Sequence, residues 1–238
     1  CAIAAEAYAR IHNEIAALCV TTGPGGTNAI TGVLGGWLDS IPMLVLSCQV
    51  RYDTTARWSG LGIRAMGDQE FDICKSIDCM TKYSEMVIDP MRIRYCLEKA
   101  LYLAKSGRPG PCWLDIPLNV QGAFVETEDL EGFDPEDYEN GGTGWGTMGN
   151  IHAIPEDEAG KGEKRQLLQG KVSRETADLI LSKIRAAKRP VINAGNGIRI
   201  AGAHDVFMLV ADKLTIPINT RSDSDALIFY TLPLHTAL

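Results

Sequence analysis

The residues with the clearest chemical potential in this sequence form one short turn, Thr21-Thr22-Gly23-Pro24-Gly25-Gly26-Thr27-Asn28. The turn follows an uninterrupted apolar run at 15–20 and precedes a helix-length segment at 27–40. Such a turn points backbone N–H groups into the crevice at the carboxyl end of a parallel sheet, where α/β proteins bind ligands. The turn has neither the G-x-G-x-x-G pattern nor the Lys-Ser/Thr end of a phosphate loop, so ordinary nucleotide binding is not predicted. A plain strand-to-helix turn is the alternative interpretation.

Other arrangements that could do chemistry are weak. The four histidines, at 12, 152, 204 and 235, lie far apart, and none has metal-ligand spacing to a cysteine or carboxylate. No Gly-x-Ser-x-Gly motif occurs, and the seven cysteines include no Cys-x-x-Cys pair. We therefore expect no metal ligands in this chain and no zinc or dithiol site.

Composition excludes several classes of partner. The net charge is −7, so we expect neither nucleic acid nor an anionic membrane surface as a partner. No apolar stretch reaches the roughly 20 residues that a membrane span requires, and no signal peptide opens the chain. Scattered thiols in apolar runs are typical of a reducing compartment. The sequence predicts a cytoplasmic protein.

Helix-length segments alternate with short apolar runs over residues 1–123. We expect strands at 15–20, 43–47 and 112–116, and helices at 27–40, near 69–77 and at 90–105. The first two runs do not alternate in polarity, which is typical of strands covered on both faces. The pattern predicts an α/β fold with a doubly wound parallel sheet.

The rest of the chain reads differently. Residues 124–170 are acidic and then glycine-rich, which predicts a linker, and strands and helices resume over 171–238. Two helices and two strands are few for an independent α/β domain, so this second unit is expected to be partial. The chain also opens at Cys1 within a helical pattern, which suggests truncation upstream.

Several further motifs follow the glycine turn in a fixed order. They are Leu38-Asp39-Ser40-Ile41-Pro42-Met43, Ser47-Cys48-Gln49-Val50, Gly67-Asp68-Gln69-Glu70-Phe71-Asp72-Ile73, Thr81-Lys82-Tyr83 and Gly107-Arg108-Pro109-Gly110-Pro111-Cys112-Trp113-Leu114-Asp115-Ile116-Pro117. The series resembles the pyrimidine-binding domain of the acetolactate-synthase-like family of thiamine-diphosphate-dependent enzymes. The segment at 189–197 resembles the start of the family's central domain.

The resemblance implies a carboligase or decarboxylase that acts on 2-keto acids and uses thiamine diphosphate with Mg²⁺. In this family the cofactor lies between the domains of two chains, which implies a second copy as partner in a homodimer or tetramer. Some members hold FAD in the central domain, so the resemblance allows a flavin at 193–197. The proton-relay glutamate of the family precedes the helix with which this chain begins, and Glu6 is not a substitute for it.

Carried over position by position, Gly23, Pro24, Gly25 and Asn28 match the loop that lines the aminopyrimidine ring. Gln69 matches a glutamine at the substrate end of the site, and Lys82 matches a lysine near the substrate channel, although a solvated surface lysine is an equal alternative. No catalytic residue is assigned within these residues. Because the relay glutamate and the Gly-Asp-Gly…Asn element for Mg²⁺ are both missing, this chain is expected to be inactive alone.

Two departures from the family pattern affect the substrate. Acetolactate synthases usually have Phe where this chain has Asp68, and Gly where it has Cys48. An acid in place of an apolar contact should change the acceptor. Two alternatives therefore stay open: another thiamine-diphosphate enzyme, either a 2-keto-acid decarboxylase or a carboligase of sugar biosynthesis, and a non-catalytic oligomerisation remnant.

Overall fold

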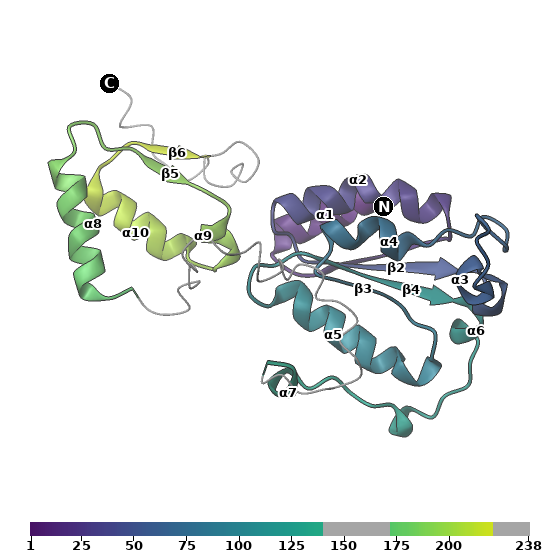
Figure 1. Cartoon of the computed structure of the whole chain (residues 1–238). Helices are drawn as coiled ribbons and strands as arrows, with labels where there is room; N and C mark the ends of the chain where they lie inside the picture. The colour runs from purple at the N-terminus through teal and green to yellow at the C-terminus, as the bar shows by residue number, and fades with distance from the viewer. Residues whose placement is uncertain (140–171, 221–238) are drawn as a thin grey trace. The chain divides into compact units, whose positions relative to one another are not determined.

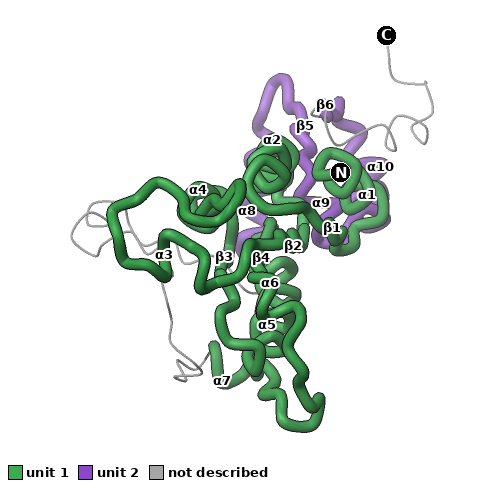
Figure 2. Tube along the Cα trace, turned by 90° about the vertical axis from the view of Figure 1, so that its right-hand side faces the viewer, with its two compact units in different colours: residues 1–156 green, residues 157–238 purple. Residues whose placement is uncertain are grey.

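The computed structural model describes residues 1–139 and 172–220. They belong to two compact units, Cys1–Glu156 and Asp157–Leu238, which Figure 2 shows in different colours. The predicted linker begins at residue 124, but its described part, 124–139, lies in the first unit. There Phe133 packs against the first unit's core.

The first unit is built on a four-stranded parallel sheet with the strand order β1-β2-β4-β3. The strands are β1 (Ala16–Val20), β2 (Met43–Gln49), β3 (Tyr83–Met86) and β4 (Pro111–Pro117). Helices α1 (Ala2–His12), α2 (Pro24–Leu38) and α4 (Ile73–Ile77) lie on one face, and α5 (Ile93–Lys105) lies on the other (Figure 1). The predicted doubly wound α/β fold is confirmed.

Shorter elements occupy the connections of this unit. They are the single 3₁₀ turns Tyr52–Thr54, Asp78–Met80, Pro90–Arg92 and Thr127–Asp129, and the short helices α3 (Ala56–Ser59), α6 (Leu118–Gln121) and α7 (Pro135–Glu139).

The two central strands, β2 and β4, are buried on both faces, as their apolar runs predict. Successive side chains of a strand point to opposite faces. Accordingly Met43, Val45 and Trp113 belong to the core beneath α1, α2 and α4, whereas Leu44 and Leu114 belong to the core beneath α5. Edge strand β1 is covered on one face only, since Ala17 and Cys19 are exposed.

Helix α5 covers its face of the sheet with side chains of mixed size. Asp89 accepts a hydrogen bond from the backbone N–H of Met91 (3.0 Å) and so starts the turn that leads into the helix. The residues buried along α5 are Tyr95, Cys96, Lys99, Ala100 and Ala104. Leu101 of the same helix is 42% exposed. Ala100 and Ala104 are fully buried in the core beneath the helix.

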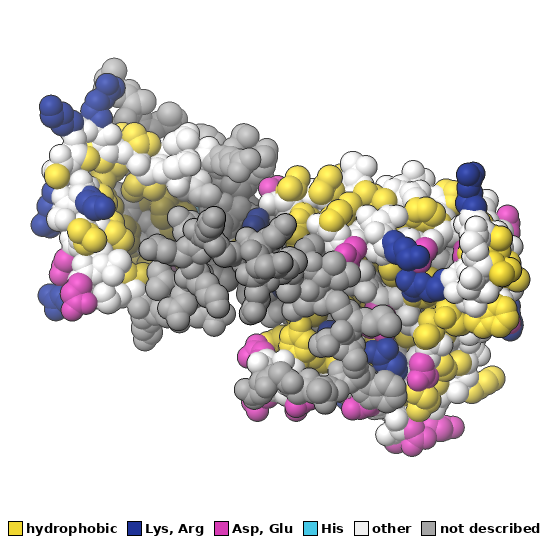
Figure 3. All heavy atoms as spheres, in the orientation of Figure 1, with side chains coloured by type: hydrophobic (Ala, Val, Ile, Leu, Met, Phe, Trp, Pro, Cys, Tyr) yellow, Lys and Arg dark blue, Asp and Glu magenta, His cyan; other side chains and the backbone are white. Residues whose placement is uncertain are grey.

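The second unit is smaller and less buried. It pairs two parallel strands, β5 (Ile192–Ala194) and β6 (Ile218–Thr220), with helices α8 (Arg174–Ala186), α9 (Gly197–Ile200) and α10 (His204–Leu214). Among the described residues of this unit only Ala194 and Ala211 are buried. Its exposed apolar side chains include Leu179, Ile180, Leu181, Val206, Leu209 and Val210. Figure 3 shows hydrophobic side chains on the surface of both units.

Helices α1 and α2 touch backbone to backbone at Gly32. A Cβ atom at this position would lie 2.7 Å from both the carbonyl carbon and the Cβ of Ala2, and 2.7 Å from the backbone nitrogen of Ile3. Gly35, on the same helix, has only the carboxylate of Glu6 near, at 3.6 Å. A methyl group therefore fits at 35 and not at 32.

We expect Gly32→Ala to lower the free energy of unfolding of the first unit by about 1–3 kcal/mol, because backbone atoms of α1 must move to admit the methyl group. Gly35→Ala is the matched control and should be neutral or stabilising by up to about 1 kcal/mol, because alanine favours the helix. Urea unfolding of both variants measures the difference. Equal stability of the two variants would show that the helices do not meet as described.

Candidate functional site

The glycine turn lies at the carboxyl end of the sheet, between the end of β1 at Val20 and the start of α2 at Pro24. Gly23 caps α2 with a φ of 54°, in the left-handed region that glycine adopts without strain, and no side chain caps the helix. Pro24, Thr27 and Asn28 are exposed around the first turn of α2. A flat ligand can therefore approach the start of the helix.

The structure brings Gln69 against this turn. A Cβ atom at position 23 would lie 2.2 Å from the carbonyl oxygen of Gln69 and 3.4 Å from its Cβ atom. Gln69 has a φ of 56° and is exposed. Only glycine at position 23 permits this contact. The glycine is therefore required by packing within the chain, whether or not a ligand binds.

The segment that carries Gln69 is braced by the neighbouring carboxylate. Glu70 accepts hydrogen bonds from the backbone N–H groups of Ala56 (2.6 Å), Met66 (2.7 Å) and Gly67 (3.3 Å). Large apolar side chains are exposed along the same segment: Trp58, Leu61, Ile63, Met66 and Phe71. The segment that carries Gln69 therefore presents apolar side chains at its surface.

Beneath both segments lies a buried polar network on the ends of β2 and β4. Asp115, 1% exposed, accepts hydrogen bonds from the hydroxyl of Ser47 (2.6 Å) and from Nε2 of Gln49 (3.0 Å). Trp113 donates from Nε1 to the Ser47 hydroxyl oxygen (2.8 Å). The hydroxyl of Thr22 donates to Oε1 of Gln49 (2.7 Å), which joins the network to the glycine turn.

Burial raises the pKa of Asp115 to about 6, although hydrogen bonds from Ser47 and Gln49 favour its ionised form. Asp72 lies near enough to raise this pKa further, and its own carboxylate pairs with Arg57 (3.2 Å) and Lys75 (3.1 Å). Burial also raises the pKa of the Cys74 thiol, so this cysteine stays protonated.

The structure does not bring Lys82 to the same edge. Lys82 precedes β3, its backbone N–H donates to Pro111 at the start of β4 (2.8 Å), and its ammonium donates to the carbonyl of Ser106. These contacts place it at the amino end of the sheet, opposite the glycine turn. Burial lowers the pKa of Lys82.

The residues that depart from the family pattern lie at the carboxyl edge. Asp68 is exposed beside Gln69, and Cys48 is half-buried beside Gln49. The sequence did not single out Gln49, Asp115 or Glu70 as site residues. One signal was available for Asp115, since an acid within the apolar run at 112–116 has to find partners when it is buried.

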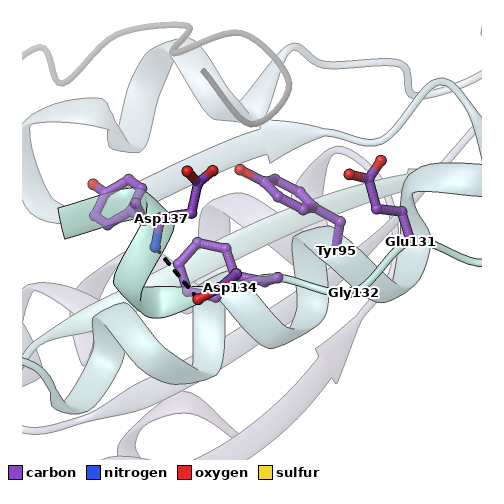
Figure 4. Close-up of a pocket in the computed structure, with 7 residues that line it drawn as sticks. Tyr95, Glu131, Gly132, Asp134 and Asp137 are labelled. Atoms are coloured by element: carbon purple, nitrogen blue, oxygen red, sulfur yellow. Dashed lines mark hydrogen bonds between the residues drawn. The ribbon is translucent and has the colours of Figure 1, made fainter. Parts of the chain in front are cut away.

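A small hollow of about 50 Å³ lies elsewhere in the first unit, between α5 and the segment before α7 (Figure 4). Tyr95, Phe133 and Tyr138 supply its aromatic walls, and Asp134 caps α7 by accepting from the backbone N–H of Glu136 (2.8 Å). The ammonium of Lys99 lies 4.7 to 5.7 Å from the ring centroids of Tyr83, Tyr95 and Tyr138. These aromatic rings are therefore already in contact with a cation of the same chain, the Lys99 ammonium.

Within 1–139 and 172–220, no three His, Cys, Asp or Glu residues are grouped so that they could hold a metal ion. The same residues contain no helix that is long and apolar enough to cross a membrane.

Comparison with known proteins identifies relatives of this chain. Residues 1–75 match the family model of the thiamine pyrophosphate enzyme, N-terminal TPP binding domain. The chain is 31% identical over 214 residues to the acetolactate synthase large subunit of Lactococcus lactis subsp. lactis (strain IL1403), which is 90% of this chain and 31% of that protein. It is similar over most of its length to the acetolactate-synthase-like family of thiamine-diphosphate-dependent enzymes.

Two further relatives show a similar coverage. The acetolactate synthase isozyme 3 large subunit of Escherichia coli (strain K12) is 32% identical over 221 residues, or 90% of this chain and 31% of that protein. The acetolactate synthase large subunit of Parasynechococcus marenigrum (strain WH8102) is 30% identical over 242 residues, or 98% of this chain and 33% of that protein. The acetolactate-synthase-like chain thus spans about a third of the length of these relatives.

The contact between Gly23 and Gln69 leads to a direct test. We expect Gly23→Ala to destabilise the first unit through both an unfavourable backbone conformation and a clash with the Gln69 carbonyl, at a total of about 2–5 kcal/mol. Gly60 also has a positive φ, 63°, but nothing lies within 4 Å of a Cβ atom there. Gly60→Ala should therefore cost only the conformational part, about 1–2 kcal/mol. If the two urea midpoints coincide, the close contact is absent.

The raised pKa of Asp115 predicts a pH dependence. Because its pKa is about 6 in the folded protein and 3.8 for an ordinary aspartate, the folded protein binds this proton more tightly than the unfolded chain, and stability falls as pH rises from about 4 to about 6. This one group should account for about 3 kcal/mol over that range. In Asp115→Asn, which keeps an oxygen to accept from Ser47, this part of the fall should vanish. Parallel pH profiles of the two proteins in urea unfolding would contradict the assignment.

Proposed function

We propose that this chain supplies the aminopyrimidine-binding side of a thiamine-diphosphate site in an enzyme that acts on 2-keto acids. The observation that carries the proposal is the contact of the Gly23 turn with Gln69 at the carboxyl edge of the sheet, in a chain similar to this family. Activity, substrate and partners of the whole protein are part of the proposal.

The residues of the turn suit the group. The backbone at Gly23 and Gly25 carries no side chain, and Pro24 and Asn28 are exposed at the first turn of α2. We propose that these four residues line the aminopyrimidine ring and that Gln69 contacts substrate. When bound, thiamine diphosphate supplies an electron sink that holds the carbanion left by decarboxylation of a 2-keto acid. The chain's own part is to orient that ring and to shape the acceptor pocket with the apolar segment at 58–71.

We also propose Mg²⁺ and allow a flavin as cofactors of the whole protein. Mg²⁺ would be held outside them, since they contain no suitable cluster. A flavin at 193–197 is a further proposal, supported by the open space at Gly195 and Gly197. Lys82 lies at the opposite end of the sheet from the glycine turn. If it contacts a substrate channel, that channel is not the one beside the glycine turn of the same chain.

We also propose a cytoplasmic enzyme that works as a homodimer or tetramer. The acidic net charge and free thiols support the compartment. Exposed apolar residues on α1 and α2, namely Ile3, Ile11 and Leu38, support burial against a second copy.

Asp68 favours a second candidate, a thiamine-diphosphate enzyme with a different acceptor. Its carboxylate is exposed beside Gln69, where the family usually presents an apolar ring. A charged group there would disfavour an apolar acceptor and favour one that carries hydroxyl groups, as in the carboligases of sugar biosynthesis. The alternative of a non-catalytic oligomerisation module predicts no turnover with any acceptor.

The test uses the gene product that carries this chain, with pyruvate, thiamine diphosphate and Mg²⁺. We expect carbon dioxide release that depends on added thiamine diphosphate, and none from residues 1–238 by themselves, which contain neither the relay glutamate nor the metal element of the family. Asp68→Phe should shift the product ratio toward apolar 2-keto-acid acceptors about tenfold or more.

Asp53→Asn is the matched control, because Asp53 is an exposed acid in the same connection and pairs with Arg51 (3.0 Å). It should leave the product ratio unchanged. No cofactor-dependent turnover by the gene product with any acceptor would overturn the proposed function, whereas an unchanged ratio in Asp68→Phe would reject only the role of Asp68.

A further inference from the structure

One buried amide touches both segments that form the candidate site. Gln49 is 4% exposed at the end of β2. Its Oε1 accepts from the Thr22 hydroxyl (2.7 Å), and its Nε2 donates to the carbonyl of Phe71 (2.9 Å). Thr22 directly precedes Gly23 within the glycine turn, and Phe71 follows Gln69 by two residues. The side chain therefore bridges two segments that are far apart in the sequence.

The same amide is fixed from the other side by the sheet. Nε2 also donates to Oδ2 of Asp115 (3.0 Å), and Oε1 also accepts from the backbone N–H of Val50 (3.0 Å). All four hydrogen bonds that a glutamine amide can make are thus present, two to the sheet and two to the site segments. Exchanging the oxygen and nitrogen would place the NH₂ group against the Val50 N–H and the oxygen against the Phe71 carbonyl and the Asp115 carboxylate, so the amide has a single orientation.

No other residue type reproduces these contacts. A carboxylate lacks the donors for Phe71 and Asp115, and an apolar side chain leaves Thr22, Phe71 and Asp115 without partners in a buried place. The contact of Gly23 with the Gln69 carbonyl requires both segments to lie at a defined distance from the sheet. The hydrogen bonds of Gln49 to Thr22 and Phe71 tie both segments to the end of β2.

We propose that Gln49 is a positioning residue, which holds the Gly23 turn and the Gln69 segment at a fixed spacing above the sheet. The catalytic consequence rests on the proposed function, since the two segments would face cofactor and substrate. The spacing itself does not, because it follows from hydrogen bonds within the chain.

Hydrogen–deuterium exchange of the full chain tests the spacing without any ligand. In Gln49→Leu we expect backbone amides at 21–28 and at 67–73 to exchange about fivefold to tenfold faster, because each segment loses a hydrogen bond to the sheet. Thr22→Val keeps the shape of Thr22 and removes its hydroxyl, so the increase should be largest at 21–28. In the double variant Thr22→Val should add nothing at 21–28, because its partner is already gone.

Ser47→Ala is the matched control. It removes the hydrogen bonds of Ser47 to Asp115 and Trp113 in the same network but leaves Gln49 with both site segments. It should destabilise the unit with no excess exchange at 21–28 and 67–73. The proposal is overturned if Ser47→Ala and Gln49→Leu give the same exchange pattern, or if Thr22→Val changes nothing locally.

A second readout separates this proposal from the proposed function. In the gene product we expect Thr22→Val to raise the KM for thiamine diphosphate about fivefold with a smaller change in kcat, and Ser47→Ala to leave that KM unchanged. If the unaltered protein neither binds nor uses thiamine diphosphate, the proposed function fails while the exchange pattern still decides the role of Gln49. If the protein is active and Thr22→Val leaves the KM unchanged, the positioning role in the cofactor site is rejected.

Discussion

The carboxylate of Asp115 has to be stabilised at a place that water does not reach, at the end of the central strand β4. A buried carboxyl group needs hydrogen-bond donors, and here they come from Ser47 and Gln49 on the neighbouring strand. Both donors alternate with half-buried residues along β2, so they point to the same face of the sheet. This need for donors explains why β2, otherwise apolar, ends with the polar residues Ser47 and Gln49.

The fold and the candidate site are coupled through the same group of atoms. Gln49 satisfies Asp115 on one side and reaches the two loops on the other, so the order of the loops depends on the sheet rather than on the loops alone. The loops then meet at the Gly23 to Gln69 contact, which leaves no room for a Cβ atom. A continuous series of close contacts thus runs from the strand interior to the exposed edge.

The hydrophobic pattern of the sequence predicted most of the strands of the first unit. Apolar runs gave β1, β2 and β4 within one or two residues, and the glycine turn was expected at the carboxyl end of the sheet, where it lies. Strand β3 was not predicted, because Tyr83, Ser84 and Glu85 are only half-buried at the sheet edge and show no apolar pattern. The buried residues of α5 include Tyr95 and Lys99 beside Cys96, Ala100 and Ala104, so burial along this helix depends on contacts with the rest of the unit and not on hydrophobicity alone. Three-dimensional contacts such as that of Gly23 with Gln69 leave no local signal, so that spacing could not be predicted; the family resemblance alone pointed to Gln69.

The aromatic cluster around Lys99 has a consequence for how far the first unit extends. The segment that carries Phe133 and Tyr138 closes over Tyr95 and over the Lys99 ammonium, and Glu98 accepts from the backbone N–H of Phe133 (2.7 Å). Cation–π contacts of this kind stabilise a desolvated ammonium, and the nearby charge of Glu85 also favours it. An excised domain that stops at residue 123 would expose these rings together with the lysine, whereas one that continues to residue 139 keeps them covered. The segment up to residue 139 is thus a structural part of the first unit, because it covers a lysine on α5.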